Sequence, residues 1–168
     1  MASMYQVSVP VYIRRLNGLA GCLKKAQALY AEKKYDETSL LTQRLFPDMF
    51  TFAKQVQAAT DHARTSAARL AGQEPPAYGA DEKTIADLIA RVEKTVAFLQ
   101  TIKPEQIDGS EDKTIAFKFR GNDVSYKGMD FLLNSNMPNF YFHATTAYAI
   151  LRSNGVEVGK RDFMGPAA

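Results

Sequence analysis

Histidine is scarce in this chain, and its two copies define the chemistry that the sequence can support. His143 lies in a segment without charged residues that runs from Phe131 to Leu151. Asn139 precedes His143 by four positions, so both side chains share one face of a helix. His62 belongs to a different predicted helix, where it flanks the apolar stripe. Because facing helices of a bundle can bring such side chains together, the two histidines are candidates for a shared site.

Three interpretations of His143 remain open on the sequence. A lone histidine on an apolar helix face is most often a core residue, hydrogen-bonded to a hydroxyl or carbonyl group. By residue type, the candidate hydroxyl partners are Tyr12, Tyr141, Thr145, Thr146 and Tyr148. A second interpretation is a cleft for a small ligand, lined by His143, Asn139, Tyr148 and His62. The third is a metal site formed by His143, His62 and Asn139.

Other kinds of functional site have weaker support. Cys22 lies on an apolar helix face, with nothing nearby in sequence that would activate it, so we expect a buried, unreactive thiol. Glycines are dispersed, and no glycine-rich phosphate loop follows a predicted strand. Basic residues occur singly or in pairs, with acids among them. This pattern does not match the concentrated basic surface of a nucleic-acid-binding protein.

Length and composition predict one soluble domain that spans residues 1–168. Hydrophobic residues make up 46% and charged residues 23% of the chain, as in ordinary globular proteins. The uncharged segment 131–151 is long enough for a membrane span, but its asparagines, proline and histidine favour a buried helix instead. The N-terminal segment lacks the pattern of a secretory signal, and the single cysteine suits a reducing compartment. We therefore expect a cytoplasmic protein without a membrane partner.

Hydrophobic periodicity predicts an all-α protein with four long helices. The first helix begins at Ser3 or Pro10, and the second runs from Asp48 to about Ala71. The third follows a cap at Asp81, and the fourth runs from about Met129 to Ser153 with a kink near Pro138. Between the third and fourth helices, the period changes to two from Lys113 to Tyr126, and Gly121-Asn122 fits a turn. The predicted fold is an antiparallel four-helix bundle with a short β-hairpin between helices three and four.

Three stretches of the sequence resemble a known family. They are SMYQVSVPVYIRRL near the start, RLFPDMFTFAKQVQAATDHA on the second predicted helix, and PNFYFHATTAYAILRSNGVEVGKRDF near the end. Together they look like a domain-of-unknown-function branch of the DinB/YfiT-like metalloenzyme superfamily, over essentially the whole chain. This resemblance implies a DinB-like four-helix bundle that is often dimeric.

The resemblance also implies a site. In the wider superfamily, which includes thiol-dependent transferases and isomerases, three histidines hold a divalent metal in a central cleft. His143 matches the second histidine of a pair on the fourth helix, and Asn139 occupies the first position of that pair. The remaining ligand would fall near Ala58, one turn before His62. Asparagine is a poorer ligand than histidine for Zn²⁺ or Ni²⁺, so we expect weak or absent metal affinity.

Two classes of function remain open. The first is a small-molecule enzyme or ligand-binding protein with a degenerate metal site between helices. The second is a non-catalytic dimeric bundle that acts through partner binding or self-association. The fourth predicted helix is apolar on nearly all sides between Met137 and Leu151, so it needs cover from the hairpin, the C-terminal tail or a second subunit. We therefore predict a homodimer.

Overall fold

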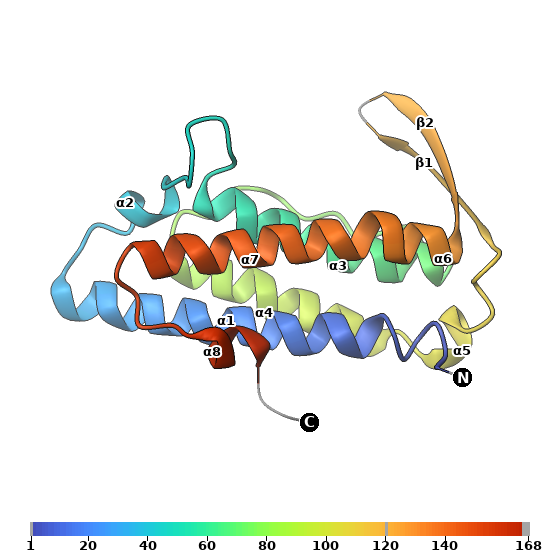
Figure 1. The fold of residues 1–168 in the computed structure, drawn as a ribbon, viewed down its shortest axis with the longest axis horizontal. Coiled ribbons are helices and arrows are strands. Elements are labelled where there is room, and N and C mark those ends of the chain that lie inside the picture. Colours follow the sequence, from blue (N-terminus) through green and yellow to red (C-terminus); the bar gives the residue numbers. More distant parts are fainter. Residues whose placement is uncertain (1, 120, 166–168) are drawn as a thin grey trace.

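The computed structural model describes residues 2–119 and 121–165 as a mostly helical protein with a small antiparallel sheet (Figure 1). The long helices are α1 (Val9–Lys33), α3 (Phe52–Leu70), α4 (Ile85–Thr101) and α7 (Met137–Ser153). The shorter ones are α2 (Thr38–Leu41), α5 (Pro104–Ile107), α6 (Gly128–Asp130), the π-helix η1 (Phe131–Asn136) and α8 (Lys160–Met164). Strands β1 (Thr114–Phe119) and β2 (Asn122–Lys127) form a ribbon in which Thr114 pairs with Lys127.

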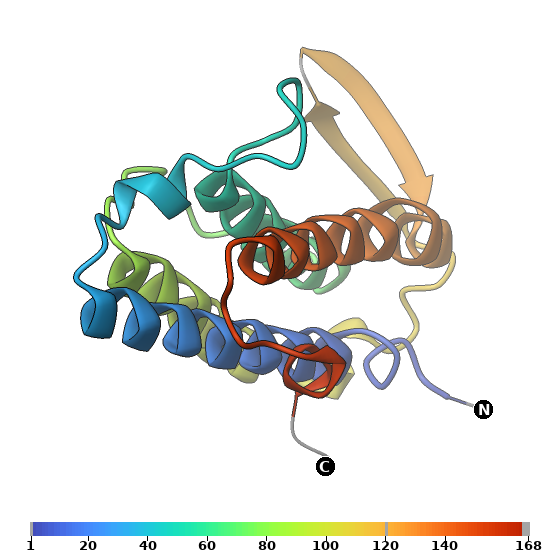
Figure 2. The ribbon, with the colours of Figure 1, turned by 60° about the vertical axis from the view of Figure 1, so that its left-hand side comes forward.

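The long helices pack in pairs around the core. Helix α3 packs mainly against α7 and also against α4, while α1 packs mainly against α4. The ribbon precedes α6 in the chain and projects from that end of the long helices, on the side where α3 and α7 lie (Figure 2). These contacts place one face of α3 opposite α7 and beside the ribbon, and this is where the histidines lie.

Capping by threonine sets the start of α3. This helix begins at Phe52 rather than at Asp48, so the sequence prediction placed its start too early. The Thr51 hydroxyl accepts a hydrogen bond from the backbone N–H of Lys54 at 3.3 Å, which satisfies one of the unpaired donors of the first turn. In α1 the first turn contains Pro10, which confirms the later of the two predicted starts.

A second threonine sets the start of α4, where the prediction of a cap at Asp81 was wrong. Helix α4 begins at Ile85 with Thr84 as its N-cap. The backbone N–H of Asp87 donates to the Thr84 hydroxyl at 3.1 Å, and the Asp87 carboxylate accepts from the Thr84 backbone N–H at 2.9 Å. This reciprocal pair is a capping box, which gives the helix a defined first turn.

The segment that ends in α7 changes its helical geometry ahead of Pro138. Residues of η1 adopt a π-helix directly before the turn that contains this proline, which has no backbone N–H to donate. Asn136 ends the π-helical stretch with its side chain turned inward, 3% exposed. Among the described residues, no helix is long and apolar enough to cross a membrane, this segment included.

The C-terminal tail and the ribbon both cover apolar surface. Phe163 of α8 packs against Tyr148 of α7, with ring centroids 5.7 Å apart. Its carbonyl oxygen lies so close to Gly18 of α1 that a Cβ atom there would be 2.5 Å away, so glycine is required for this approach. On the ribbon, Phe117 contacts Phe131 of η1 at 5.7 Å. Thus the tail covers part of the segment from Met137 to Leu151, for which the sequence predicted additional cover, while the ribbon covers Phe131 ahead of it.

Candidate functional site

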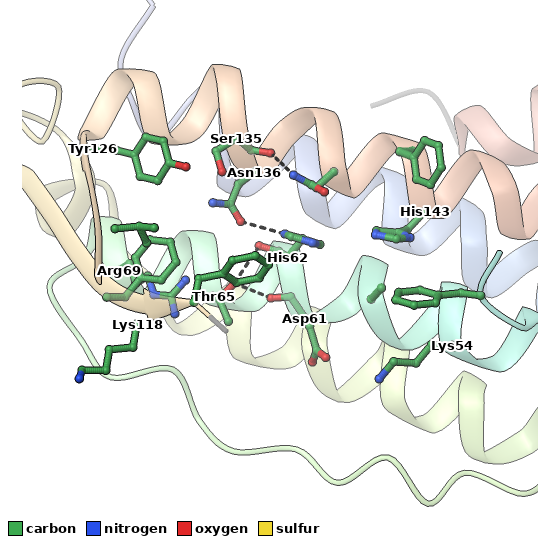
Figure 3. A pocket seen from close by; sticks show the side chains of 17 residues that line it. Lys54, Asp61, His62, Thr65, Arg69, Lys118, Tyr126, Ser135, Asn136 and His143 are labelled. Carbon is green, nitrogen blue, oxygen red and sulfur yellow. Dashed lines mark hydrogen bonds between the residues drawn. The ribbon is translucent and has the colours of Figure 1, made fainter. Parts of the chain in front are cut away.

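A cavity of about 670 Å³ lies between α3, the η1–α7 segment and the β1–β2 ribbon. Its floor is one face of α3, since the lining residues of this helix recur every three or four positions: Lys54, Ala58, Asp61, His62, Thr65 and Arg69. At a rise of 1.5 Å per residue, this face is about 22 Å long. In Figure 3, Lys54 and His143 lie toward one end, Arg69 and Lys118 toward the other, and His62 between them.

The two histidines meet inside this cavity. Their ring centroids are 5.6 Å apart and their planes differ by 13°, so the imidazoles stack. Phe50 stacks near His143 as well, at 5.8 Å and 10°, while the Phe142 ring meets His143 edge-on at 5.3 Å. His143 is only 9% exposed. The site is therefore a cluster of aromatic rings in which the two imidazoles stack, with His143 the most deeply buried of them.

The orientation of His143 is set by Gln55. Its Nδ1 lies 2.7 Å from Oε1 of Gln55, a residue of α3 that is itself buried. The Gln55 amide nitrogen donates to the Phe50 carbonyl at 3.3 Å, which directs the amide oxygen toward the histidine. Nδ1 must then carry the proton, so Nε2 keeps its lone pair. This partner is an amide rather than one of the hydroxyl groups that the sequence suggested.

The orientation of His62 is set from the π-helical segment. Its Nδ1 lies 3.2 Å from Oδ1 of Asn136. With the amide oxygen as acceptor, Nδ1 is again the protonated nitrogen, and Nε2 has an available lone pair. Both histidines are thus anchored through Nδ1 by a side-chain amide oxygen from another helix. Asn136 of η1 holds His62 of α3, and Gln55 of α3 holds His143 of α7.

Burial keeps both imidazoles neutral. It lowers the pKa of His143 to about 4, and nearby His62 and Lys54 act in the same direction. Burial also lowers the pKa of His62, although the hydrogen bond to Asn136 and the charge of Asp61 partly oppose this effect. At neutral pH each ring therefore combines a fixed donor at Nδ1 with an acceptor at Nε2.

A network of arginines holds Asp61, the residue before His62. Its Oδ1 accepts from Nη2 of Arg64 at 2.9 Å and from Nη2 of Arg91 at 2.7 Å. Both arginine side chains are buried, with 9% and 4% exposed. Arg91 also binds Glu82 at 2.6 Å and the Thr60 hydroxyl at 2.7 Å. Arg64 and Arg91 therefore neutralise the charge of Asp61. The ion pair between Asp61 and Arg91 also joins α3 to α4 next to His62.

Three of the four predicted cleft residues come together. His143, His62 and Asn139 line the same cavity. Asn139 is exposed, and its side-chain amide donates to the Ser135 carbonyl at 2.7 Å. Tyr148 is not among the described residues that line this cavity, because it faces the tail and packs against Phe163.

The donor set does not fit the three-histidine metal site that the family resemblance implies. Ala58 and Asn139, at two of the three implied ligand positions, both line the cavity, but neither supplies an imidazole. Within the described ranges, no three His, Cys, Asp or Glu side chains gather as a metal site would require. The nitrogen donors that do meet there are His143 and His62, and the amide of Asn139 is turned toward Ser135.

Several functional side chains are absent from the predicted set. Gln55 and Asn136 orient the histidines, and Arg69 lines the ribbon end of the cavity. A sequence signal for Arg69 exists: Lys54, Ala58, His62, Thr65 and Arg69 follow one another at helical spacing and form a second face beside the apolar stripe. No comparable signal identifies Gln55 and Asn136, since their roles depend on how α3 and the η1–α7 segment meet in space.

Comparisons with known proteins agree with this architecture. Residues 4–164 match DUF1993, a family described as a domain of unknown function. Among solved structures, the crystal structure of a DinB family member protein from Shewanella denitrificans has a TM-score of 0.85 and 36% sequence identity. That match covers 97% of this chain and 92% of the other. No curated protein matched the chain.

Proposed function

This chain belongs to the DUF1993 family, a branch of the DinB-like superfamily, and we propose that it binds a small molecule in the cavity between α3, α7 and the ribbon. The observation that carries this proposal is the stacked, neutral pair of His62 and His143 that lines the cavity. Cavities of several hundred Å³ with aromatic walls and a few convergent polar groups are typical small-molecule sites.

The histidines are suited to recognising a hydrogen-bond donor. Each Nδ1–H is already bound to an amide oxygen, so each Nε2 can accept from a hydroxyl or N–H group of the ligand. A general base works best when its pKa lies near the operating pH, and the pKa of His143 is about 4. The arrangement therefore supports binding and orientation of a ligand more strongly than proton abstraction by His143.

The same lone pairs could hold a divalent metal only as a degenerate site. His143 would be the principal ligand, with His62, Asn139 or water completing the coordination. Two imidazoles and an amide oxygen bind Zn²⁺ or Ni²⁺ less tightly than three imidazoles do, so we expect weak metal affinity. Ligand binding in the proposed function does not depend on such a metal.

We infer that the helices which form this site belong to one antiparallel four-helix bundle of the DinB type, made of α1, α3, α4 and α7. The packing of α3 on α7 and of α1 on α4 supports this inference. The ribbon is then an insert ahead of the last long helix, and it serves as one wall of the cavity.

The proposal is tested by filling the cavity. N-phenyl-1-naphthylamine, an uncharged aromatic dye whose fluorescence rises in apolar sites, should bind the wild-type protein. Ala58→Phe places a ring on the cavity floor, where it takes up space that the dye would occupy. It should raise the dissociation constant of the dye by about tenfold or more, which corresponds to a loss of about 1.4 kcal/mol of binding free energy. Thr145→Phe, at an exposed position of α7 outside the described lining, is the matched control. Dye binding that is equal in all three proteins would contradict the proposal.

A further inference from the structure

The cavity carries a surplus of positive charge that the histidine pair does not explain. Arg69 and Lys118 line the end beneath the ribbon, and Lys54 lines the opposite end (Figure 3). Among the described lining residues, Asp61 alone is acidic, and two buried arginines already bind its carboxylate. A ligand that enters this cavity therefore meets the positive charges of Arg69 and Lys54, with which no acidic residue of the described lining pairs.

Arg69 is the cation best placed to bind a ligand. Its side chain is half-buried, and its Cζ lies 3.7 Å from the centroid of the Phe117 ring. Burial lowers the pKa of Arg69, with nearby Glu74 opposing this effect, and the guanidinium remains charged at neutral pH. Arg64 and Arg91 bind the carboxylate of Asp61, whereas the structure shows no hydrogen bond or ion pair between the Arg69 guanidinium and another described residue.

An unmatched guanidinium in a partly desolvated wall has a defined binding preference. Arginine presents several N–H donors in a planar fork, and carboxylate, sulfonate and phosphate oxygens match that geometry. Losing water without gaining acceptors is unfavourable for a charged group, so an anion that supplies acceptors recovers that loss. The cation–π contact with Phe117 holds the guanidinium in place against the ribbon and limits the entropy lost on binding.

The surroundings of Arg69 are aromatic. Phe117 and Tyr126 project from neighbouring positions on β1 and β2 and lie 6.3 Å apart, centroid to centroid. Both rings line the cavity, so a flat apolar group next to the anion would contact them. Lys118 is 76% exposed and lies 3.9 Å from Asp123, so it attracts anions from a distance instead of fixing them.

We propose that the cavity selects small molecules in which a carboxylate, sulfonate or phosphate group is attached to a flat apolar body. The anionic group binds the guanidinium of Arg69 beneath the ribbon, and the body extends along α3 toward the histidine pair. This inference rests on the proposed function, because it names the ligand class of the same cavity. It assigns Arg69 as the residue that determines specificity.

Two dyes with the same aromatic body test this assignment. The probe is 8-anilinonaphthalene-1-sulfonate, and its uncharged counterpart is N-phenyl-1-naphthylamine. In low-salt buffer, the sulfonate dye should bind the wild-type protein at least about tenfold more tightly than the uncharged dye. Arg69→Gln should weaken binding of the sulfonate dye by about tenfold and leave binding of the uncharged dye within about twofold. Arg69→Lys should retain part of the preference for the anion.

Matched variants separate this effect from a change in overall charge or stability. Arg161→Gln makes the same charge change at an exposed position of α8, and it should leave binding of both dyes unchanged. Lys118→Gln alters a side chain that is 76% exposed, and it should weaken binding of the sulfonate dye only, by less than Arg69→Gln does. If Arg69→Gln does not fold, as judged by circular dichroism, Arg69→Lys and Lys118→Gln provide the comparison.

The possible outcomes distinguish the two proposals. Equal affinity for the two dyes, or an affinity for the sulfonate dye that does not respond to the Arg69 and Lys118 variants, overturns the assignment of Arg69 and leaves the ligand-binding cavity intact. Binding of neither dye overturns the ligand-binding cavity itself. Selective loss of the sulfonate dye in the Arg69 variants supports both.

Discussion

His62 on α3 and His143 on α7 stack with their ring centroids 5.6 Å apart, in a cavity bounded by both helices and the ribbon. Each ring is anchored through Nδ1 by an amide oxygen, from Asn136 and Gln55 respectively. Burial lowers the pKa of both. The cavity is therefore lined by a pair of neutral imidazoles whose Nε2 atoms can accept hydrogen bonds.

The stability of the protein should depend on pH through His143. Its pKa falls from an ordinary value of 6.5 to about 4 on folding, so between these values the unfolded chain binds a proton that the folded chain does not. The free energy of unfolding should therefore decrease as the pH drops through this window, by roughly 2 kcal/mol at pH 4.5. Urea unfolding of the wild type and of His143→Gln at pH 7 and pH 4.5 measures this contribution. The same pH dependence in both proteins would show that His143 does not titrate as described.

The partner of His143 can be tested by making it acidic. Gln55→Glu places a carboxylate 2.7 Å from Nδ1, where it favours the imidazolium form and should raise the pKa of His143 by about 1 to 3 units. Gln55→Leu is the control: the pKa should remain low, and the unpaired buried donor should cost about 1–3 kcal/mol of stability. The titration is followed by NMR of the histidine ring protons. An unchanged pKa in Gln55→Glu would mean that another group holds Nδ1.

The proposal of a degenerate metal site leads to a prediction of gained function. The wild type should bind Zn²⁺ and Ni²⁺ weakly, and His143→Ala should remove the remaining affinity. The double variant Ala58→His/Asn139→His supplies two further imidazoles to the cavity that His143 lines, so its affinity should rise by about two orders of magnitude or more. Isothermal titration of protein purified without an affinity tag measures all three. Tight stoichiometric binding by the wild type that survives His143→Ala would contradict this assignment.

Self-association is predicted from the apolar surface that the chain leaves exposed. Phe142 of α7 is 56% exposed and Phe46, in the loop before α3, is 64% exposed. Burying such side chains is favourable at about 25 cal/mol per Å², so a second copy that covers them would be stabilised. Sedimentation velocity at micromolar concentration should show a dimer, and Phe142→Glu should shift it toward the monomer. A wild type that sediments only at 18.6 kDa would argue against self-association.

The sequence predicted helical content well because its apolar residues recur with a clear period. The apolar pattern correctly predicted that the last long helix ends at Ser153. The alternation of apolar and polar residues correctly predicted the two strands β1 and β2. The starts of α3 and α4 were not, because Asp48 and Asp81 looked like helix-initiating residues while two threonines make the capping hydrogen bonds. Residue type alone does not indicate which of several nearby polar side chains will cap a helix.

The site was predictable only in part, for a related reason. Spacing along one helix placed Asn139 and His143 on a shared face, and both line the cavity. The contact between His62 and His143 depends on the register between α3 and α7, which periodicity does not specify. Asn136 reaches His62 from a π-helical turn, a local change of geometry that leaves no mark in a 3.6-residue pattern.

The most direct test of the ligand-binding cavity uses the two histidines as reporters. Because the chain contains only two, ¹³C-labelled histidine gives two sets of ring signals, and both rings lie in the cavity. Titration with 8-anilinonaphthalene-1-sulfonate should shift the signals of His62 and His143 together, with one dissociation constant. Ala58→Phe should abolish these shifts while Thr145→Phe leaves them intact. Dye fluorescence that saturates while both histidine signals stay unmoved would show that binding occurs elsewhere and would contradict the central claim.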